Sequence, residues 1–350
     1  MGKIVVIGAF GLINNQLDGQ TVKTRNVCQL LRSYSSDEIM DVDTQGMRRN
    51  PLLIFRMIYR LIKCHTAIII PARKSLTYLF PVVYIMSKIF RFNIILICVG
   101  GWQLEYFKGD SVNRPRVLQL KMCKKIRAFL PEMEKVNNDL KREFGFQNTE
   151  VFLNFRHINP LISNRNETET LKLVYLGRIQ KRKGYETIFN FVDNLKNKPL
   201  NITVTFFGQI DKCDIEEFSS LVNRYSDYVK YEGELSPNQI QDRLSYYDVL
   251  LFPTTYYTEG LPGTIIDAFS AGLPVIATKW KLAEELICNE KDGFIVPFSD
   301  GQDEFNDRIV FLYNNRKILS EMKQCSRNKA LLFSEEIAWQ TLSKYLIHKP

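Results

Sequence analysis

Short apolar runs alternate with longer amphipathic stretches along most of the 350-residue chain. Runs such as 4–7 and 171–176 have the composition of buried strands, and stretches such as 21–33 have the period of a helix. Strands that alternate with helices pair in parallel, and the helices cover both faces of the sheet. The pattern predicts an α/β fold, with further strands at 67–70, 94–99, 126–130, 151–155, 202–207, 229–232, 249–252, 274–277 and 294–296.

A polar stretch at 157–170, rich in Asn, Ser, Thr and Glu, interrupts the alternation, which then restarts. Such a stretch is typical of a linker between domains, and the chain is long enough for two domains of ordinary size. We expect an N-terminal domain over 1–160 and a C-terminal domain over 161–333, each with a parallel sheet. Because ligands bind at the carboxyl ends of such strands, we expect a cleft where those ends face one another.

The cysteines and histidines argue against metal sites and disulfides. The seven cysteines are scattered without a C-x-x-C pair, and there are only three histidines. The N-terminus lacks the layout of a signal peptide, and the uncharged stretches are shorter than the ~20 residues of a membrane span. We therefore expect a reduced, cytoplasmic protein.

The turn after the strand at 171–176 is basic and bounded by glycines. It reads Gly177-Arg178-Ile179-Gln180-Lys181-Arg182-Lys183-Gly184. Arg178 offers a planar fork and Lys183 a compact charge, so the pair is well suited to a diphosphate. The alternative is a basic turn exposed to solvent, since such turns are common.

A second motif follows the strand at 249–252. Pro262 suits the first turn of a helix over 262–271, so the backbone N–H groups of Gly263, Thr264 and Ile265 would form an anion site there. Glu259 precedes this helix and Asp267 lies within it, so one carboxylate could bind a sugar and the other a ribose. Either acid alone is more often a residue that only interacts favourably with the helix dipole. Both acids together in this strand–loop–helix arrangement indicate a site.

Glycines also follow the first strand, where Gly8 and Gly11 precede Gly19 and Gln20 at the start of a helix. The spacing differs from G-x-G-x-x-G, so a dinucleotide cofactor is weakly supported. The loop either lets the backbone approach a ligand or is an ordinary connection. Asp41-Val42-Asp43 is interpreted as a strand end, since no other ligand cluster supports a metal there.

Excess positive charge lies in the first half of the chain. Residues 1–160 hold 24 basic and 12 acidic residues, within a total net charge of +9. Arg49, Arg56, Arg60 and Lys63 are spaced to share one face of a helix over 51–63, which could lie on an anionic membrane. The alternative is a core helix with a solvated basic face. No nucleic-acid module is recognised, so nucleic acid is not an expected partner.

The ordered motifs over about 171–297 resemble family 4 of the retaining GT-B glycosyltransferases. They are G-R-x-x-x-x-K-G at 177–184, Phe207-Gly208, Tyr231-Glu232-Gly233, E-G-x-P with a carboxylate eight residues on, and Ala271-Gly272-Leu273-Pro274-Val275-Ile276. In the first half, the stretch 19–26, Gly100-Gly101-Trp102 and Asn154-Phe155-Arg156 look like members that build capsule, O-antigen or exopolysaccharide. The resemblance implies two Rossmann-like domains, with a final helix in 334–350 that packs back on the first.

The resemblance also implies roles for individual residues. Arg178 and Lys183 would neutralise the diphosphate of a UDP- or GDP-sugar, and Glu259 would contact the transferred sugar. The donor would further be bound by Gly208, Glu234, Leu235, Gly263, Thr264, Ile265 and Asp267, and the acceptor side would include Gly11, Gly19, Gln20, Gly101 and Trp102. The family needs no divalent metal or other cofactor.

Two positions depart from the family pattern. The second acidic position is commonly Glu and is Asp267 here, and the histidine that many relatives carry after the fourth strand is replaced by Gly100-Gly101-Trp102. Without that histidine, the acceptor hydroxyl can attack on the face that the diphosphate leaves and pass its proton to the departing phosphate. We expect sugar transfer to a saccharide acceptor, such as a polyprenyl-linked one. A sugar-nucleotide epimerase, a phosphorylase or a non-catalytic nucleotide-binding partner are the alternatives.

Overall fold

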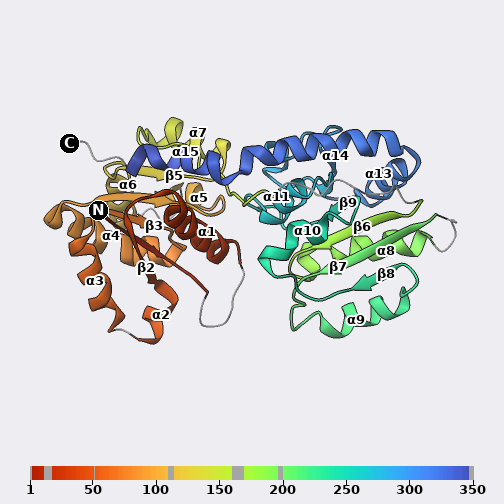
Figure 1. Cartoon of the computed structure of the whole chain (residues 1–350), viewed down its shortest axis with the longest axis horizontal. Helices are drawn as coiled ribbons and strands as arrows, with labels where there is room; N and C mark the ends of the chain where they lie inside the picture. Colours follow the sequence, from red (N-terminus) through yellow and green to blue (C-terminus); the bar gives the residue numbers. More distant parts are fainter. Residues whose placement is uncertain are drawn as a thin grey trace. The chain divides into compact units, whose positions relative to one another are not determined.

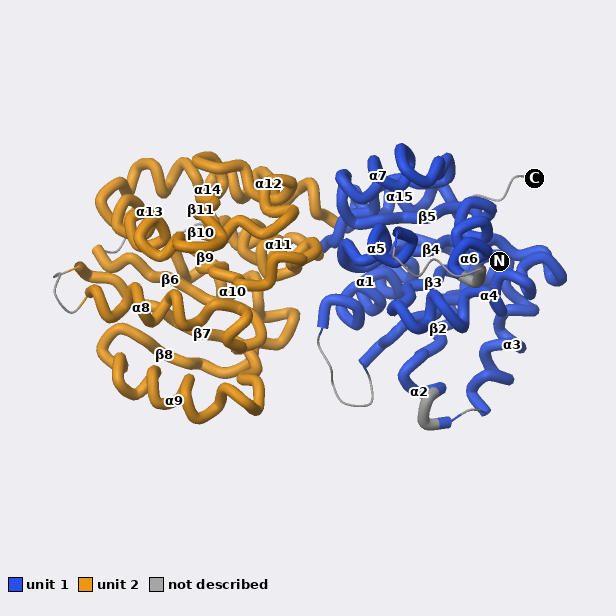
Figure 2. Tube along the Cα trace, turned by 180° about the vertical axis from the view of Figure 1, so that it is seen from behind, with its two compact units in different colours: residues 1–155, 335–350 blue, residues 156–334 orange. Residues whose placement is uncertain are grey.

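The computed structural model describes residues 2–11, 18–50, 52–108, 114–159, 169–195 and 200–346, without the side chains of residues 48, 49, 114 and 115. The chain forms two compact units (Figure 2). Unit 1 consists of residues 1–155 and 335–350, and unit 2 of residues 156–334. The boundary precedes the expected residue 160, and the last helix, α15 (Glu335–Leu346), belongs to unit 1.

Unit 1 is built on a parallel sheet with the strand order β2-β1-β3-β4-β5 (Figure 1). On one face, α1 and α15 bury Leu30 and Leu342 against Ile4 and Val6 of β1, which are two residues apart and so point to the same side. The strands are β1 (Lys3–Gly8), β2 (Glu38–Asp43), β3 (Thr66–Ile69), β4 (Asn93–Ile97) and β5 (Ala128–Leu130). The other helices are α1 (Gly19–Tyr34), α2 (Thr44–Arg49), α3 (Leu53–Lys63), α4 (Arg73–Phe90), α5 (Gln103–Lys108), α6 (Arg114–Cys123) and α7 (Glu134–Phe144).

The expected strand at 151–155 is not formed, because a buried lysine binds its backbone. Nζ of Lys23 donates to the carbonyl oxygens of Phe152, at 3.2 Å, and Leu153, at 2.6 Å. Carbonyls directed at an ammonium are not available to a neighbouring strand. Phe152 and Phe155 are still buried in the core of unit 1. The prediction that these apolar residues are buried is therefore confirmed, and the prediction that they form a strand is wrong.

The predicted helix over 51–63 with four cations on one face is corrected as well. The carboxylate of Asp43 accepts a hydrogen bond from the backbone N–H of Gln45 at 3.0 Å and caps α2, which contains Arg49. Arg56, Arg60 and Lys63 lie on α3 instead. Within the described parts of the chain, no helix has both the length and the apolar character to cross a membrane.

Unit 2 contains a second parallel sheet with the strand order β11-β10-β9-β6-β7-β8 (Figure 2). The chain order reverses beside β6, so the loops after β6 and β9 leave neighbouring strands at the same edge, which is the usual ligand position in such sheets. The strands are β6 (Leu171–Leu176), β7 (Ile202–Phe207), β8 (Val229–Tyr231), β9 (Val249–Phe252), β10 (Val275–Thr278) and β11 (Gly293–Val296). The helices are α8 (Tyr185–Leu195), α9 (Ile215–Arg224), α10 (Ile240–Leu244), α11 (Gly263–Ser270), α12 (Ala283–Leu286), α13 (Gln302–Asn314) and α14 (Arg316–Ala330), with short 3₁₀ turns η1 (Lys181–Lys183), η2 (Pro237–Gln239) and η3 (Leu331–Phe333).

Candidate functional site

The basic turn after β6 is bonded directly to the segment after β9. The backbone N–H of Thr255 donates to the carbonyl of Arg182 at 3.0 Å. Gly184 closes the turn with a φ of +79°, and a Cβ on it would lie 1.7 Å from the carbonyl oxygen of Pro253. Only glycine therefore allows this approach, which brings the side chain of Lys183 to the β9 loop.

Lys183 forms an ion pair with Glu259. Its Nζ contacts Oε1 of Glu259, and the Lys183 and Glu259 side chains are 26% and 12% exposed. The hydroxyl of the buried Thr254 donates to the same Oε1 at 3.2 Å. Burial and the negative charge of Glu259 together raise the pKa of the nearby Tyr175 well above its usual range. The structure thus joins two of the predicted catalytic side chains, one cationic and one anionic, in a half-buried site.

Helix α11 begins four residues after Glu259. The helix begins at Gly263, one residue after its N-cap Pro262. The N–H of Ile265 donates to the Pro262 carbonyl at 3.1 Å, so the prediction of a free N–H at Ile265 was wrong. For Gly263 and Thr264, no acceptor occurs among the residues that the structure describes. Two N–H groups, rather than three, are available to an anion there.

Arg178 extends from the same turn. Its side chain is exposed, and its backbone carbonyl accepts a hydrogen bond from the buried hydroxyl of Tyr175 at 2.8 Å. The preceding Gly177 has a φ of +145°, and a Cβ on it would lie 4.0 Å from the Thr264 hydroxyl. Arg178 is therefore anchored by its backbone, at a turn that faces the start of α11, while its guanidinium stays at the surface.

Close backbone contacts also join the turns after β6, β7 and β8. A Cβ on Gly208 would lie 1.9 Å from the Gly177 carbonyl oxygen, so glycine is required there. The N–H of Gly208 donates to the carbonyl of Gly233 at 2.8 Å. The predicted Glu234 follows directly and is exposed, and Leu235 is half-buried. These predicted donor-binding residues thus border the Gly177–Gly208 contact.

Asp267 lies in α11 and is buried with a cationic partner. Arg156 donates from Nε to Oδ1 of Asp267 at 2.6 Å and from Nη2 to Oδ2 at 3.3 Å. Two parallel bonds of this kind fix a carboxylate strongly. The expectation that Asp267 is available to a ribose therefore changes, because Arg156 already occupies one side of the carboxylate.

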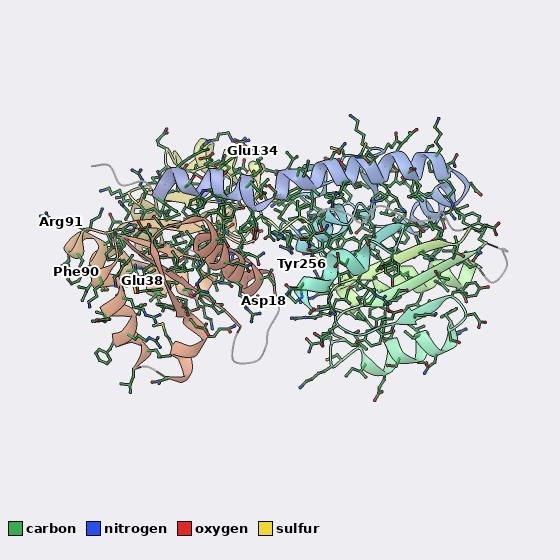
Figure 3. The ribbon with its side chains drawn as sticks, viewed as in Figure 1. Asp18, Glu38, Phe90, Arg91, Glu134 and Tyr256 are labelled. Carbon is green, nitrogen blue, oxygen red and sulfur yellow. The ribbon has the colours of Figure 1, made fainter. Side chains whose placement is uncertain are left out.

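The predicted acceptor-side residues lie in unit 1, at the carboxyl ends of adjacent strands. Gly11 follows β1 in the left-handed region with a φ of +66°, and Gly19 opens α1 after its cap Asp18 (Figure 3). Gln20 donates from Nε2 to the Ile70 carbonyl at 3.2 Å, just beyond β3. Beyond β4, Gly101 and Trp102 are half-buried, and the indole of Trp102 lies 5.8 Å from the guanidinium of Arg73. These residues border one edge of the sheet.

Sequence reasoning missed three residues of these sites. Thr254 lies just after β9, and this position near the carboxyl end of a strand is the signal that could have identified it as a site residue. Arg156 was quoted only as part of a family-like tripeptide, since nothing in the sequence pairs it with Asp267. Lys23 lies 3.5 Å from Glu132, whose other oxygen accepts the N–H of Gly100 at 2.8 Å, and both side chains are buried. A lysine within an amphipathic helix gives no sign of such burial.

Solved structures share this fold. Anabaena HepE, solved in complex with UDP and glucose, matches with a TM-score of 0.71 and 14% identity, over 99% of both chains. The sucrose-phosphate synthase of Thermosynechococcus elongatus matches with a TM-score of 0.71 and 15% identity, over 99% of this chain and 98% of that one. The expected GT-B fold, with two parallel sheets and their helices, is confirmed.

Curated relatives match mainly over part of the chain. The capsular polysaccharide biosynthesis glycosyltransferase CapM of Staphylococcus aureus is 27% identical over 216 residues, which are 57% of this chain and 52% of CapM. An Escherichia coli UDP-Gal:alpha-D-GlcNAc-diphosphoundecaprenol alpha-1,3-galactosyltransferase is 35% identical over 92 residues, 26% of this chain and 23% of that enzyme. The chain thus spans about half the length of CapM and less of the galactosyltransferase.

A family model described as glycosyl transferases group 1 matches residues 161–329, which include the basic turn, Glu259 and α11. This is the part of the chain in which the ordered motifs were found. Residues 161–329, just under half of the chain, are thus similar to the glycosyl transferases group 1 family.

Proposed function

We propose that this chain is a retaining glycosyltransferase that moves a hexosyl group from a nucleoside-diphosphate sugar to a saccharide acceptor in the synthesis of a bacterial surface polysaccharide. The observation that carries the proposal is the Lys183–Glu259 pair, whose acid precedes the N-terminus of α11 by four residues. A cation, an anion and two backbone donors in one half-buried site suit a donor that has a diphosphate at one end and a sugar at the other.

The proposed chemistry depends on charge that develops on the leaving group. As the anomeric bond breaks, negative charge builds on the diphosphate, and Lys183, Arg178 and the N–H groups of Gly263 and Thr264 would stabilise it. Lys183 is already held by Glu259, so little reorganisation is needed when the charge appears. The acceptor hydroxyl would attack on the same face and give its proton to the departing phosphate. Glu259 would contact the transferred sugar, and no divalent metal would be required.

The nucleoside would lie along the turns after β7 and β8. Gly208, Glu234 and Leu235 would border the base, which is uracil or guanine. A carboxylate has about four lone-pair sites, and Arg156 takes two of those on Asp267. Asp267 could therefore accept hydrogen bonds from a ribose while it stays bound to Arg156. A uridine donor is favoured because HepE is solved in complex with UDP and the galactosyltransferase relative is named for UDP-Gal.

The proposed acceptor is a polyprenyl-linked saccharide. The name of the galactosyltransferase relative describes a diphosphoundecaprenol-linked acceptor, and CapM is named for capsule synthesis. Gly11, Gly19, Gln20, Gly101 and Trp102 of unit 1 would bind this acceptor. The protein would work at the cytoplasmic face of the membrane that holds the lipid, with the cations of α3 facing an anionic leaflet.

The test compares two lysines of the same turn. Lys183→Ala removes the proposed diphosphate ligand, whereas Lys181→Ala removes an exposed lysine that pairs with Glu217 at 2.7 Å. First, thermal shifts and calorimetry with UDP, GDP and their sugars identify the donor. Transfer of labelled sugar to a synthetic polyprenyl-diphosphate saccharide is then measured. We expect Lys183→Ala to lower kcat about 100-fold or more and Lys181→Ala to change it less than twofold.

The products distinguish the other reactions. The proposal expects an anomeric configuration equal to that of the donor, measured by NMR of the product. Inversion at the anomeric carbon, equal activity of the two lysine variants, or conversion of the donor without acceptor would each contradict it. Conversion of the donor without acceptor would indicate an epimerase. A requirement for inorganic phosphate would indicate a phosphorylase, and nucleotide binding without turnover would indicate a non-catalytic partner.

A further inference from the structure

Two helices of unit 1 expose an apolar stripe on the side away from the sheet. In α3 and the residue before it, Leu52, Phe55, Tyr59 and Ile62 follow one another at helical spacing, and Phe55 is 68% exposed. The opposite side of α3 is also apolar, because Met57 and Leu61 are buried. A helix that is apolar on both sides needs an apolar environment beyond the core it already covers.

The neighbouring helix α4 repeats this arrangement. Tyr78, Val82, Ile85 and Ile89 form one stripe on it, and Tyr78 is 75% exposed. Helix α3 contacts α4, and α4 contacts α6, so the three helices lie side by side on one face of the sheet. We call this outer surface the apolar face. Its exposed members are the two apolar stripes of α3 and α4 named above. Exposed patches of this extent mark interaction sites.

The helices that form the apolar face carry only positive charges. Helices α3, α4 and α6 each carry three basic residues and no acidic residue, and the whole stretch 44–104 contains no Asp or Glu. Nζ of Lys63 lies 4.2 Å from the ring centre of Tyr59, and Nζ of Lys88 lies 5.0 Å from that of Tyr84. Phe90 and Arg91 lie together where α4 ends (Figure 3). Cations over aromatic rings are typical of side chains at a boundary between apolar and polar surroundings.

Arg60 does not belong to this set. Its guanidinium donates to the backbone carbonyl of Asp41, and burial together with Arg56 lowers its pKa. The cations available to a partner from α3 are therefore Arg56 and Lys63, both exposed.

We infer that the apolar face inserts into the interface of an anionic lipid bilayer, with Phe55, Tyr59, Tyr78 and Ile85 among the acyl chains and Lys63 and Lys88 at the headgroups. Apolar side chains rimmed by cations alone match such a surface in both respects. A second copy of the chain fits less well, because a two-fold interface would place the same cations opposite one another. The inference rests on the proposed function only in placing the protein at a membrane, and it adds the surface that binds the lipid. Vesicle binding is measured without donor or acceptor, so it can fail while sugar transfer is retained.

The test measures binding to vesicles by sedimentation, with the full chain. One set contains 30% phosphatidylglycerol in phosphatidylcholine, and the other phosphatidylcholine alone. Phe55→Glu/Ile85→Glu places two acids in the apolar face, and Lys63→Gln/Lys88→Gln removes two cations. Ile215→Glu is the matched control, since Ile215 is an exposed apolar residue of unit 2, 47% exposed. All sites are exposed, so thermal unfolding should be unchanged.

We expect the parent chain to bind the anionic vesicles at least tenfold more tightly than the neutral ones. The affinity of the double Glu variant for the anionic vesicles should be at least tenfold lower than that of the parent chain. The affinity of the double Gln variant should be about fivefold lower for each cation removed, and that of the control should change less than twofold. Equal binding by parent and double Glu variant would overturn the inference. So would a parent chain that is dimeric by analytical ultracentrifugation and becomes monomeric in the double Glu variant, because the apolar face would then be covered by a second copy.

Discussion

Arg156 holds the carboxylate of Asp267 with two hydrogen bonds, from Nε at 2.6 Å and from Nη2 at 3.3 Å. The same residue also donates its backbone N–H to the Phe333 carbonyl at 2.9 Å. Arg156 therefore ties α11 to both segments of the chain at which unit 2 begins and ends. The position expected to bind ribose is thus part of the framework of unit 2 as well.

Replacing Arg156 by Ala should destabilise unit 2. The change leaves the buried carboxylate of Asp267 without this partner, and since the pair is partly exposed we expect a loss of about 2 kcal/mol in the free energy of unfolding, below the 3–5 kcal/mol of fully buried pairs. Arg156→Lys keeps the charge without the planar fork and should lose less. Urea unfolding measures both. An Arg156→Ala variant as stable as the parent would show that the Arg156–Asp267 pair does not contribute to the stability of the fold.

Glu259→Gln should lower turnover with little effect on stability. Glutamine has the size of glutamate but lacks the charge that positions Lys183, so we expect kcat to fall about 100-fold. Glu186→Gln makes the same change at Glu186, 3.4 Å from Lys181 in the same basic turn, and should leave kcat within twofold. The measurement is sugar transfer at saturating donor. Equal kcat in the two variants would separate Glu259 from the reaction.

Gly184→Ala should both destabilise the chain and abolish transfer. The new Cβ would lie 1.7 Å from the Pro253 carbonyl oxygen, so the turn that carries Lys183 must move away from β9. We expect a loss of more than about 2 kcal/mol. Gly233 has nearly the same φ, +78°, with no atom within 4 Å of the new Cβ. Gly233→Ala should therefore lose only the ~1 kcal/mol of the left-handed backbone. The difference in thermal stability between the Gly184→Ala and Gly233→Ala variants measures the effect of the clash. Similar losses of stability in the two variants would contradict the clash.

The Lys23→Met substitution should lower the free energy of unfolding of unit 1 by about 3 kcal/mol. Lys23 is fully buried, and its removal leaves the buried Glu132 without the ammonium 3.5 Å away and two carbonyls without their donor. Adding Glu132→Gln to Lys23→Met should restore part of the loss, because the uncompensated charge is then gone. Urea unfolding of the single and double variants gives the coupling. Strictly additive losses would mean that the two side chains act independently.

Alkaline pH should weaken the fold through Cys64. Burial raises the pKa of this thiol from 9.0 to about 12, so the folded chain keeps a proton that the unfolded chain releases above pH 9. The free energy of unfolding contributed by this thiol is therefore constant below pH 9 and falls between pH 9 and about 12. Cys64→Ala should show a smaller fall over this range when urea unfolding is followed against pH. The same slope in both proteins would assign the fall to other groups.

The strand–helix alternation and the two motifs of unit 2 could be predicted because they depend on local patterns. Period two and period 3.6 mark strands and helices, and a strand that ends before Gly177 or Gly208 brings those residues to the same edge of the sheet. The proximity of Lys183 to Glu259 follows from that topology. These site residues of unit 2 could therefore be identified from the sequence, without knowledge of their contacts.

Features that depend on one side-chain hydrogen bond could not be predicted. The segment 151–155 has the composition of a strand, but Lys23, about 130 residues earlier, binds its carbonyls. Arg49 has the right spacing to share a face with Arg56, but the cap from Asp43 begins a separate helix that ends at Arg49, and the next helix begins at Leu53. In each case a side chain decides the outcome through a hydrogen bond that a period does not encode.

The return of α15 to unit 1 has a consequence for biosynthesis. Ala338, Leu342 and Leu346 complete a core whose other members all precede residue 156. While the ribosome is still translating unit 2, the nascent first unit therefore lacks three core side chains, and the surface that they will cover is left open to water or to chaperones. Unit 2, which is continuous in the chain, can finish folding first, and a ribosome that stalls near residue 334 would leave unit 1 as the incomplete partner.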